Sequence, residues 1–341
     1  MNILYGIQGT GHGHISRARE ILPELSQVAN VDVLISGTNC KMTLDGQEVE
    51  QRRGLSLSYD SKGGVSYLKT ALELNPVRFL KDVNSLNMKQ YDLVISDFEP
   101  ISSWAAIKAG VTSISLSHQA AFLSNRVPRP PTKSHLSEQV LRRFAPCHEA
   151  IGFHFLKYDH FIEGPIIRSE IRNLTPYQGD HMTVYLPAFD PELLTSVFSG
   201  FTQVRWEIFS PACDSEYTTN KVTVRPVGNQ PFLESFESSI GVITSAGFET
   251  SAEAIFLGKK LMVVPIKNQY EQLCNAEALN MLGVPVAHHL DASFTKKVNQ
   301  LLTGNQHHRI PEFADARSIT QKIMRLAKSH DASLETHLMA V

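Results

Sequence analysis

A glycine-rich turn near the amino terminus carries two histidines, in the segment Gly9-Thr-Gly-His-Gly-His-Ile-Ser16. Glycines let the backbone approach a ligand closely, and the free N–H groups at the start of a following helix favour an anionic or hydroxyl-rich ligand. Gly11 and Gly13 are the positions predicted to lie against it. A neutral imidazole at His14 can remove a proton from an acceptor hydroxyl, so we predict a general base there. Alternatively, the histidines cap the turn or bind substrate without proton transfer, and the glycines serve the turn alone.

Asp97 is the second residue expected to take part in chemistry. It ends a short apolar run and is followed by Phe98-Glu-Pro100. A carboxylate at the carboxyl end of a parallel strand faces the ligand-binding edge of the sheet, so Asp97 is expected to orient His14 or to bind acceptor hydroxyls. The alternative is that Asp97 caps the helix beginning at Pro100.

A second glycine-bearing helix start lies in the other half of the chain, within residues 240–255. A strand, a turn containing Ser245 and Gly247, and a helix follow one another, so backbone N–H groups of the turn can bind a diphosphate. Glu253 lies near the second helical turn, where its two oxygens can accept hydrogen bonds from both hydroxyls of a ribose. Glu249 is a weaker candidate for the same ligand, and we expect it to be solvated.

Other nucleotide and metal sites are disfavoured. A dinucleotide-binding turn would place a third glycine at position 14 and an acidic residue after the second strand, where this chain has His14 and Ser36. No GxxxxGK[ST] phosphate loop and no DxD motif occurs. The histidine pairs at 288–289 and 307–308 lack a third ligand at a supportive spacing, so neither a metal site nor a bound cofactor is predicted.

The elements that must position these residues alternate between strand and helix. Short apolar runs rich in β-branched residues are separated by segments of helical period, which is typical of parallel, doubly wound α/β sheets. The first half has predicted strands at 2–7, 31–36, 55–59, 92–97, 112–117 and 150–153, and a helix at 15–28. The second half has predicted strands at 182–186, 204–209, 222–225, 240–244, 261–264 and 284–287.

The length of the chain indicates two domains, because 341 residues with 42% hydrophobic content exceed what one compact core requires. The series of strands restarts after a stretch at 163–181 that is rich in glycine, proline and polar residues, which we interpret as a hinge. We predict one domain at 1–163 and a second at 164–316. The remaining residues, 317–341, are predicted to form a helix that could cross back to the first domain.

Composition argues against several partners and locations. With 32 basic and 34 acidic residues the formal net charge is -2, so no nucleic-acid partner is expected. No apolar run approaches the roughly 20 residues of a membrane span, and the amino terminus has no basic region followed by a cleavage site. The four cysteines have no CxxC spacing. We therefore expect a cytoplasmic protein with reduced thiols.

Residues 244–276 resemble the donor-binding half of the GT-B glycosyltransferases, especially the bacterial N-acetylglucosaminyltransferases that make lipid II. The positions that carry the resemblance are Gly247, Glu253, Pro265, Glu271, Gln272 and Asn275-Ala276. The turn from Gly9 to His14 is similar to the first glycine-rich loop of that family, and the two matches occur in the family's order. The chain is also similar to little-characterised bacterial and archaeal homologues with a Gly-His-Gly-His opening.

This resemblance implies a GT-B fold, in which two Rossmann-like domains face each other across a cleft, with the acceptor on the first domain and the donor on the second. It implies a UDP-sugar donor whose ribose binds Glu253 and whose sugar contacts Glu271 and Gln272. Phe248 or the backbone at Val264-Pro265 would lie near the base. The implied reaction is a direct displacement at the anomeric carbon, with inversion and without a metal ion, after the domains close about the hinge.

The acceptor side departs from the family pattern. The family usually has His-Glu-Gln after the fifth strand, whereas this chain has Ser117-His118-Gln119, so His118 and Gln119 are expected on the acceptor side of a different acceptor. Lipid-binding members also carry an apolar and basic patch. The one possible counterpart in this sequence is a group of arginines at Arg126, Arg129, Arg142 and Arg143. We instead expect these arginines to form a charged, solvated face.

The predicted function is therefore transfer of a hexose or N-acetylhexosamine to a glycan, lipid-linked or small-molecule acceptor, as in cell-envelope or polysaccharide synthesis. Peripheral contact with the inner face of a membrane stays open. Two other functions suit the same nucleotide pocket, since a fold does not determine a reaction. They are a sugar-nucleotide epimerase or hydrolase, and a non-catalytic UDP-sugar sensor.

Overall fold

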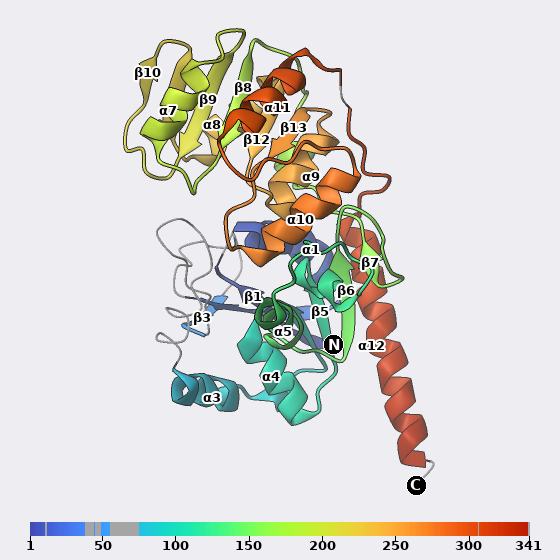
Figure 1. The fold of residues 1–341 in the computed structure, drawn as a ribbon. Coiled ribbons are helices and arrows are strands. Elements are labelled where there is room, and N and C mark those ends of the chain that lie inside the picture. Colours follow the sequence, from blue (N-terminus) through green and yellow to red (C-terminus); the bar gives the residue numbers. More distant parts are fainter. Residues whose placement is uncertain (11, 38–43, 45–48, 55–74, 306, 340–341) are drawn as a thin grey trace.

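The structure is a computed structural model that describes residues 1–10, 12–37, 44, 49–54, 75–305 and 307–339. Two separate sheets lie one above the other, each with helices on its faces (Figure 1). Within the described residues, no helix is long and apolar enough to cross a membrane.

The first sheet has seven parallel strands in the order β3-β2-β1-β4-β5-β6-β7. The order reverses at β1, which lies between β2 and β4. Such a reversal opens a crevice at the carboxyl ends of the strands. The strands are β1 (Asn2–Gln8), β2 (Asn30–Ser36), β3 (Val49–Arg52), β4 (Leu93–Asp97), β5 (Ser113–Ser117), β6 (Glu149–Phe153) and β7 (Ile162–Glu163).

The helices of this half bury one face against the sheet or against a neighbouring helix. Helix α1 places Ile15, Ala18 and Ile21 on the sheet, all fully buried, as their helical spacing predicts. The helices are α1 (His12–Leu25), α3 (Pro76–Ser85), η1 (Met88–Gln90), α4 (Pro100–Ala109), η2 (Gln119–Leu123), α5 (His135–Arg143) and, in the connecting stretch, α6 (Ser169–Arg172).

The second sheet has six strands in the order β10-β11-β9-β8-β12-β13, parallel except for β10, and its order reverses at β8. Its strands are β8 (His181–Tyr185), β9 (Arg205–Ser210), β10 (Tyr217–Thr219), β11 (Val222–Pro226), β12 (Gly241–Thr244) and β13 (Lys260–Val263). Its helices are α7 (Pro191–Ser199), α8 (Asn229–Ser238), α9 (Phe248–Phe256), α10 (Tyr270–Met281) and α11 (Ala292–Thr303).

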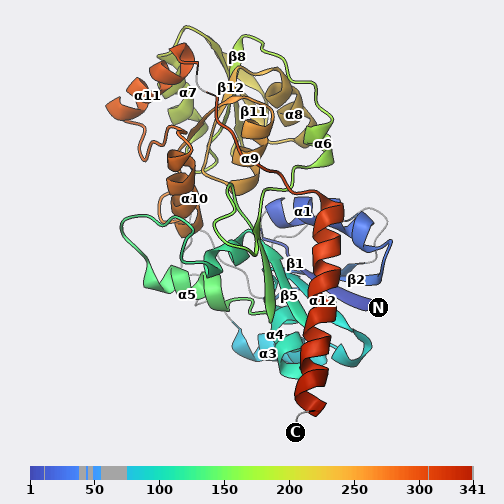
Figure 2. The same ribbon diagram turned by 90° about the vertical axis from the view of Figure 1, so that its right-hand side faces the viewer.

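The chain returns to the first sheet through helix α12 (Ala316–Met339), which runs beside α1 (Figures 1 and 2). Ile319 and Ile323 are buried there. Lys322 donates to the Glu163 carboxylate at 2.6 Å, tying the helix to the end of β7. The two crossings between the sheets run side by side, because Ile166 and Ala314 form a parallel bridge.

The strand predictions differ from the structure at few places. The predicted strand at 284–287 is wrong: only an isolated bridge joins Val286 to Val263, and Pro285 has no N–H to extend a ladder. Strands β3 and β10 were missed because Val-Glu-Gln-Arg and Tyr-Thr-Thr are mostly polar edge sequences, and β7 was missed because it has two residues. The prediction at 55–59 lies outside the described residues.

Candidate active site

The starts of α1 and α9 meet between the two sheets. Arg17 of α1 donates to the Glu249 carboxylate of α9 at 2.9 Å. A Cβ atom placed on Gly13 would lie 2.5 Å from the carboxyl carbon of Glu249, so only glycine permits this approach. Both helices follow strands at the carboxyl edges of their sheets, where ligands of doubly wound sheets bind. Gly11, which was expected to share this role, lies outside the described residues.

His14 and Asp97 form a buried pair at this meeting point. Nδ1 of His14 lies 2.6 Å from Oδ1 of Asp97, and the His14 side chain is 10% exposed. This contact leaves Nε2 as the nitrogen that can exchange a proton with a substrate. Burial alone would raise the pKa of Asp97, but the charges and hydrogen bonds of Arg17 and His14 lower it below its usual value. Asp97 therefore stays ionised and can stabilise a protonated His14.

The alternative that Asp97 caps a helix is wrong. Glu99 is the N-cap of α4, since its carboxylate accepts from the amides of Ile101 at 2.8 Å and Ser102 at 2.7 Å. The chain reaches this arrangement through Phe98, which has a positive φ of 55°. Such a backbone conformation is costly for a non-glycine residue and turns Asp97 and Glu99 in different directions.

The expectation of a solvated Glu249 is also wrong, because its carboxylate is paired with Arg17 and its side chain is 29% exposed. By contrast, the other glycine-bearing helix start borders open space. A Cβ atom on Gly247 would meet nothing within 4 Å. The amide of Ser245 is already used, since it donates to the carbonyl oxygen of Tyr185 at 3.2 Å, so it is not one of the free N–H groups expected of this turn.

Glu253 is 3% exposed and forms a two-point ion pair with Arg168 of the connecting stretch. The distances are 2.6 Å from Nε to Oε1 and 3.1 Å from the second guanidinium nitrogen to Oε2. Burial raises the pKa of Glu253, and the charge of Arg168 opposes that rise. The ribose-binding role of Glu253 stays a prediction, in which the hydroxyls would bind beside this guanidinium.

A cavity of about 370 Å³ adjoins Arg168 at the carboxyl edge of the second sheet. Tyr185 and Phe232 supply aromatic walls, with ring centroids 6.1 Å apart. The lining comes from both halves of the chain: Ser16, Arg19, Arg168, Tyr185, Val227, Gly228, Asn229, Phe232 and Thr250. Arg168 and these wall residues were not among the predicted site residues. One signal was available, since Tyr185 ends β8 and Gly228 caps the helix after β11, both at the ligand-binding edge.

Phe248 does not line this cavity. Its ring stacks on the imidazole of His118, with centroids 4.0 Å apart and planes 6° apart. Pro265 also lies outside the cavity lining and is buried. The expected place of Phe248 or of the Val264-Pro265 backbone beside a nucleotide base therefore does not coincide with this pocket.

His118 and Gln119 join the first domain to α10. His118 contacts the carbonyl oxygen of Phe153 at 2.8 Å and Oδ1 of Asn275 at 2.9 Å. Gln119 donates to the Glu271 carboxylate at 2.9 Å. The predicted acceptor-side pair and one predicted sugar-binding residue thus lie together. Gln272 instead accepts from the amide of Ile266 at 2.9 Å and holds the loop after β13.

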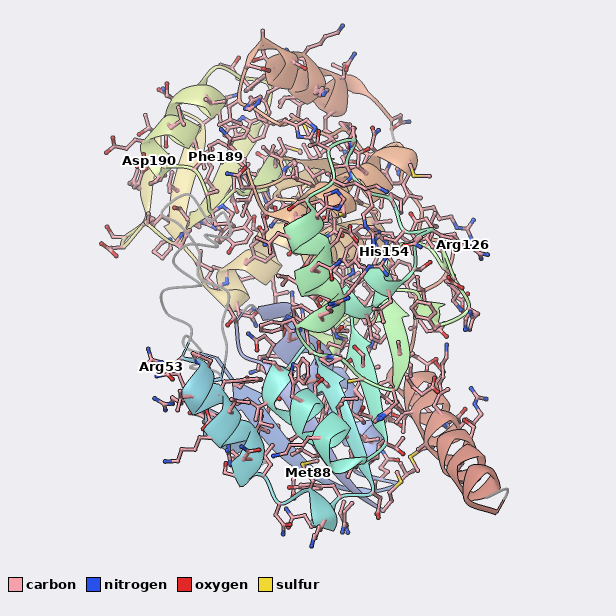
Figure 3. All side chains as sticks on the ribbon, turned by 60° about the horizontal axis from the view of Figure 1, so that its bottom comes forward. Arg53, Met88, Arg126, His154, Phe189 and Asp190 are labelled. Atoms are coloured by element: carbon pink, nitrogen blue, oxygen red, sulfur yellow. The ribbon has the colours of Figure 1, made fainter. Side chains whose placement is uncertain are left out.

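The arginines expected on a solvated face divide into two kinds. Arg126 and Arg143 are exposed, and Arg126 lies at the periphery of the molecule (Figure 3). Arg129 is different, because its side chain is 7% exposed and pairs with Glu138 at 2.5 Å. Arg142 also approaches Glu138, at 3.7 Å. Among the described residues, no cluster of three histidine, cysteine, aspartate or glutamate side chains could hold a metal ion.

Comparisons with known proteins agree with this architecture. The family model described as Glycosyl transferase family 1 matches residues 1–303. A search of curated proteins finds no significant match.

Solved structures share the fold over nearly the whole chain. MurG of Acinetobacter baumannii aligns with a TM-score of 0.57 at 13% identity, over 96% of this chain and 99% of that one. The spinosyn forosaminyltransferase SpnP aligns with a TM-score of 0.64 at 14% identity, over 96% and 99%. The glycosyltransferase SnogD from Streptomyces nogalater aligns with a TM-score of 0.57 at 14% identity, over the same shares. The two sheets are thus the Rossmann-like halves of a GT-B fold, and the chain belongs to glycosyl transferase family 1, resembling MurG-type enzymes.

Proposed function

We propose that this glycosyltransferase moves a hexosyl or N-acetylhexosaminyl group from a nucleoside-diphosphate sugar, with UDP as the expected nucleotide, to a hydroxyl of a glycan, lipid-linked or small-molecule acceptor. The observation that carries the proposal is the His14–Asp97 pair, joined at 2.6 Å where the starts of α1 and α9 meet. A base fixed at one nitrogen, whose other nitrogen has no hydrogen bond to any residue that the structure describes, suits proton removal from an acceptor hydroxyl.

In this mechanism Nε2 of His14 takes the acceptor proton while the acceptor oxygen attacks the anomeric carbon. The bond from that carbon to the β-phosphate oxygen breaks, and the nucleoside diphosphate leaves with inversion. Asp97 stabilises the imidazolium that forms, as a buried carboxylate does in other histidine-based catalysts. The amino-terminal end of α9 stabilises the leaving diphosphate, and no metal ion takes part.

The nucleotide would occupy the 370 Å³ cavity and the open space at Gly247. There the base would stack in the aromatic wall of Tyr185 and Phe232, and the ribose would bind near Glu253. The likeness to VinC in complex with dTDP and to a plant enzyme complexed with UDP-2-fluoro-glucose supports a nucleoside-diphosphate ligand.

Calorimetry with UDP, dTDP, ADP and GDP tests this assignment first. We expect one of the pyrimidine diphosphates to bind in the micromolar range, with about tenfold weaker binding in Glu253→Gln and unchanged binding in His14→Gln. Equal affinity of wild type and Glu253→Gln would remove the ribose assignment.

Product analysis then separates the rival functions. A transferase releases UDP only when a suitable acceptor is added. An epimerase interconverts donor sugars with little UDP release, a hydrolase releases UDP without an acceptor, and a sensor turns over nothing. Acceptor-independent turnover would contradict the proposal.

A further inference from the structure

Four charged or ionisable side chains form one continuous network of contacts across the domain boundary. His14 contacts Asp97, Asp97 contacts Arg17, and Arg17 contacts Glu249. The first three belong to the first domain and Glu249 to the second. The proposed reaction uses His14 and Asp97 but gives no reason for Arg17 and Glu249 to be there.

Arg17 is held from every side. Its Nε donates to Oδ2 of Asp97 and a terminal nitrogen donates to Oδ1, both at 2.8 Å. The same terminal nitrogen lies 3.3 Å from Nδ1 of His14. The guanidinium also lies 5.4 Å from the centroid of the Phe153 ring, a cation–π distance. Burial would lower the pKa of Arg17, but Asp97 and Glu249 raise it, so its charge persists.

The charges of this four-residue network sum to zero only after His14 has taken a proton. With His14 neutral, Asp97 and Glu249 against Arg17 leave one uncompensated negative charge. A proton on His14 neutralises the set. If Glu249 were withdrawn with the second domain, Asp97 and Arg17 would cancel, and the same proton would create a net positive charge in a buried site, which is unfavourable.

We propose that Arg17 and Glu249 are positioning residues: Arg17 orients Asp97 beside His14, and Glu249 offsets the charge of Arg17, so that His14 is a stronger base when the two domains are closed. This inference rests on the proposed function, and it explains how a transferase avoids an active base while its cleft is open. Glu249 comes from the donor-binding half, so the basicity of His14 rises only when the two domains are closed. Gly13 is needed for the contact between Arg17 and Glu249, because any Cβ there would push the Glu249 carboxylate away.

Other groups near this network do not supply the negative charge that Glu249 supplies. Tyr5, on β1, faces Asp97 and Arg17, and burial raises its pKa well above the ordinary value, so it stays neutral. Arg168 and Glu253 face Glu249 along α9 and are paired with each other. Phe98 stacks beside His14 with centroids 6.5 Å apart and carries no charge.

Histidine NMR tests the proposal without any substrate. Uniformly labelled histidine, with the His14 signal assigned from its loss in His14→Gln, gives the titration midpoint of His14 directly. The isosteric Glu249→Gln is expected to lower that midpoint by about half to one pH unit, because it removes the negative charge that offsets Arg17 beside the imidazole. Tyr270→Phe is the matched control. It removes another contact between the domains, the 2.7 Å hydrogen bond to Glu138, and is expected to leave the midpoint unchanged.

Kinetics give the second readout once an acceptor is known. Glu249→Gln is expected to move the acid limb of the pH–kcat profile to lower pH and to lower the plateau about threefold, since a weaker base removes protons more slowly. On an Arg17→Lys background the Glu249→Gln change should have a smaller effect, because lysine keeps the charge but cannot bridge both carboxylates and hold Glu249 in place.

Three outcomes would overturn the inference: an unmoved His14 midpoint in Glu249→Gln, an equal movement in Tyr270→Phe, or additive effects of Glu249→Gln and Arg17→Lys. None of these three outcomes would contradict the proposed function, because nucleotide binding and acceptor-dependent UDP release would be unchanged. Failure of the proposed function would appear instead as absent nucleotide binding with the NMR shift intact.

Discussion

At the start of α1, His14, Asp97 and Arg17 are bonded to one another and Gly13 has no room for a side chain, whereas the start of α9 at Gly247 borders open space and a cavity of about 370 Å³. In the first region the polar side chains are hydrogen-bonded to one another in the absence of a ligand, whereas the second region leaves space for a ligand. This difference fits a division of labour in which the base is preorganised by the protein and the donor side is completed by substrate.

The largest effect that would break this comparison comes from His14→Gln. The amide can still donate to Asp97, so folding should be unchanged, but the proton acceptor is lost. We expect kcat to fall by roughly 10²- to 10⁴-fold. Rates should be measured with a saturating donor and acceptor, and nucleotide affinity should stay within twofold. A variant that keeps more than a tenth of the activity would remove His14 from the proton-transfer step.

Glu253→Gln sharpens the donor side of the comparison. The amide leaves Arg168 without its full charge partner in a buried place, so the free energy of unfolding should fall by about 1–3 kcal/mol. Chemical denaturation measures that change, and calorimetry should show the tenfold loss of nucleotide affinity. Unchanged stability would mean that the ion pair in the structure is not held in solution.

Adding a methyl group to each helix start compares the two regions directly. Gly13→Ala should displace the flexible Glu249 carboxylate at a cost below about 1 kcal/mol of stability, yet lower kcat several-fold and move its acid limb as Glu249→Gln does. Gly247→Ala has room for its methyl group and should fold equally well, but should weaken donor binding. If both variants raised KM alone, the crowded start of α1 would have no special role in the base.

The smallest effect on activity is expected at Lys259, a buried charge of the second domain that does not line the cavity. Its Nζ donates to the carbonyl oxygens of Tyr177, Glu237 and Ser239 at 3.0, 2.6 and 2.7 Å. Burial lowers its pKa to about 8, below the value near ~10.4 of an unfolded chain. The unfolded state therefore binds more protons between these pH values, and this residue's contribution to stability should rise as pH increases through that window.

Denaturation of wild type and Lys259→Met at pH 7.5 and pH 9.5 checks the sign. We expect the wild-type advantage over the variant to grow by about 2 kcal/mol at the higher pH, with activity unaffected at pH 7.5. A shrinking advantage would contradict the lowered pKa of the buried amine.

Much of the fold could be predicted because short apolar runs mark the buried strands and apolar residues at helical spacing mark the buried face of each helix. The strands that end near His14, Asp97 and Gly247 all lie within a residue or two of their predicted bounds. The exceptions have weak local patterns. Strands β3 and β10 are polar edges, and residues 284–287 form only a bridge because Pro285 cannot donate. The roles of the predicted site residues stay predictions, and their placement is what the structure adds.

The sequence by itself determined the parallel α/β class and the two glycine-bearing helix starts, because each follows from local spacing, and it placed His14 in the first of them while the role of His14 as a base stays a prediction. Only the tertiary structure decided that Arg17 meets Glu249, 232 residues away, that Arg168 pairs with Glu253, and that Phe248 lies on His118 rather than in the cavity. Periodicity indicates that a charged residue lies on one side of a helix. Which opposite charge it meets depends on how two separately folded sheets are set against each other.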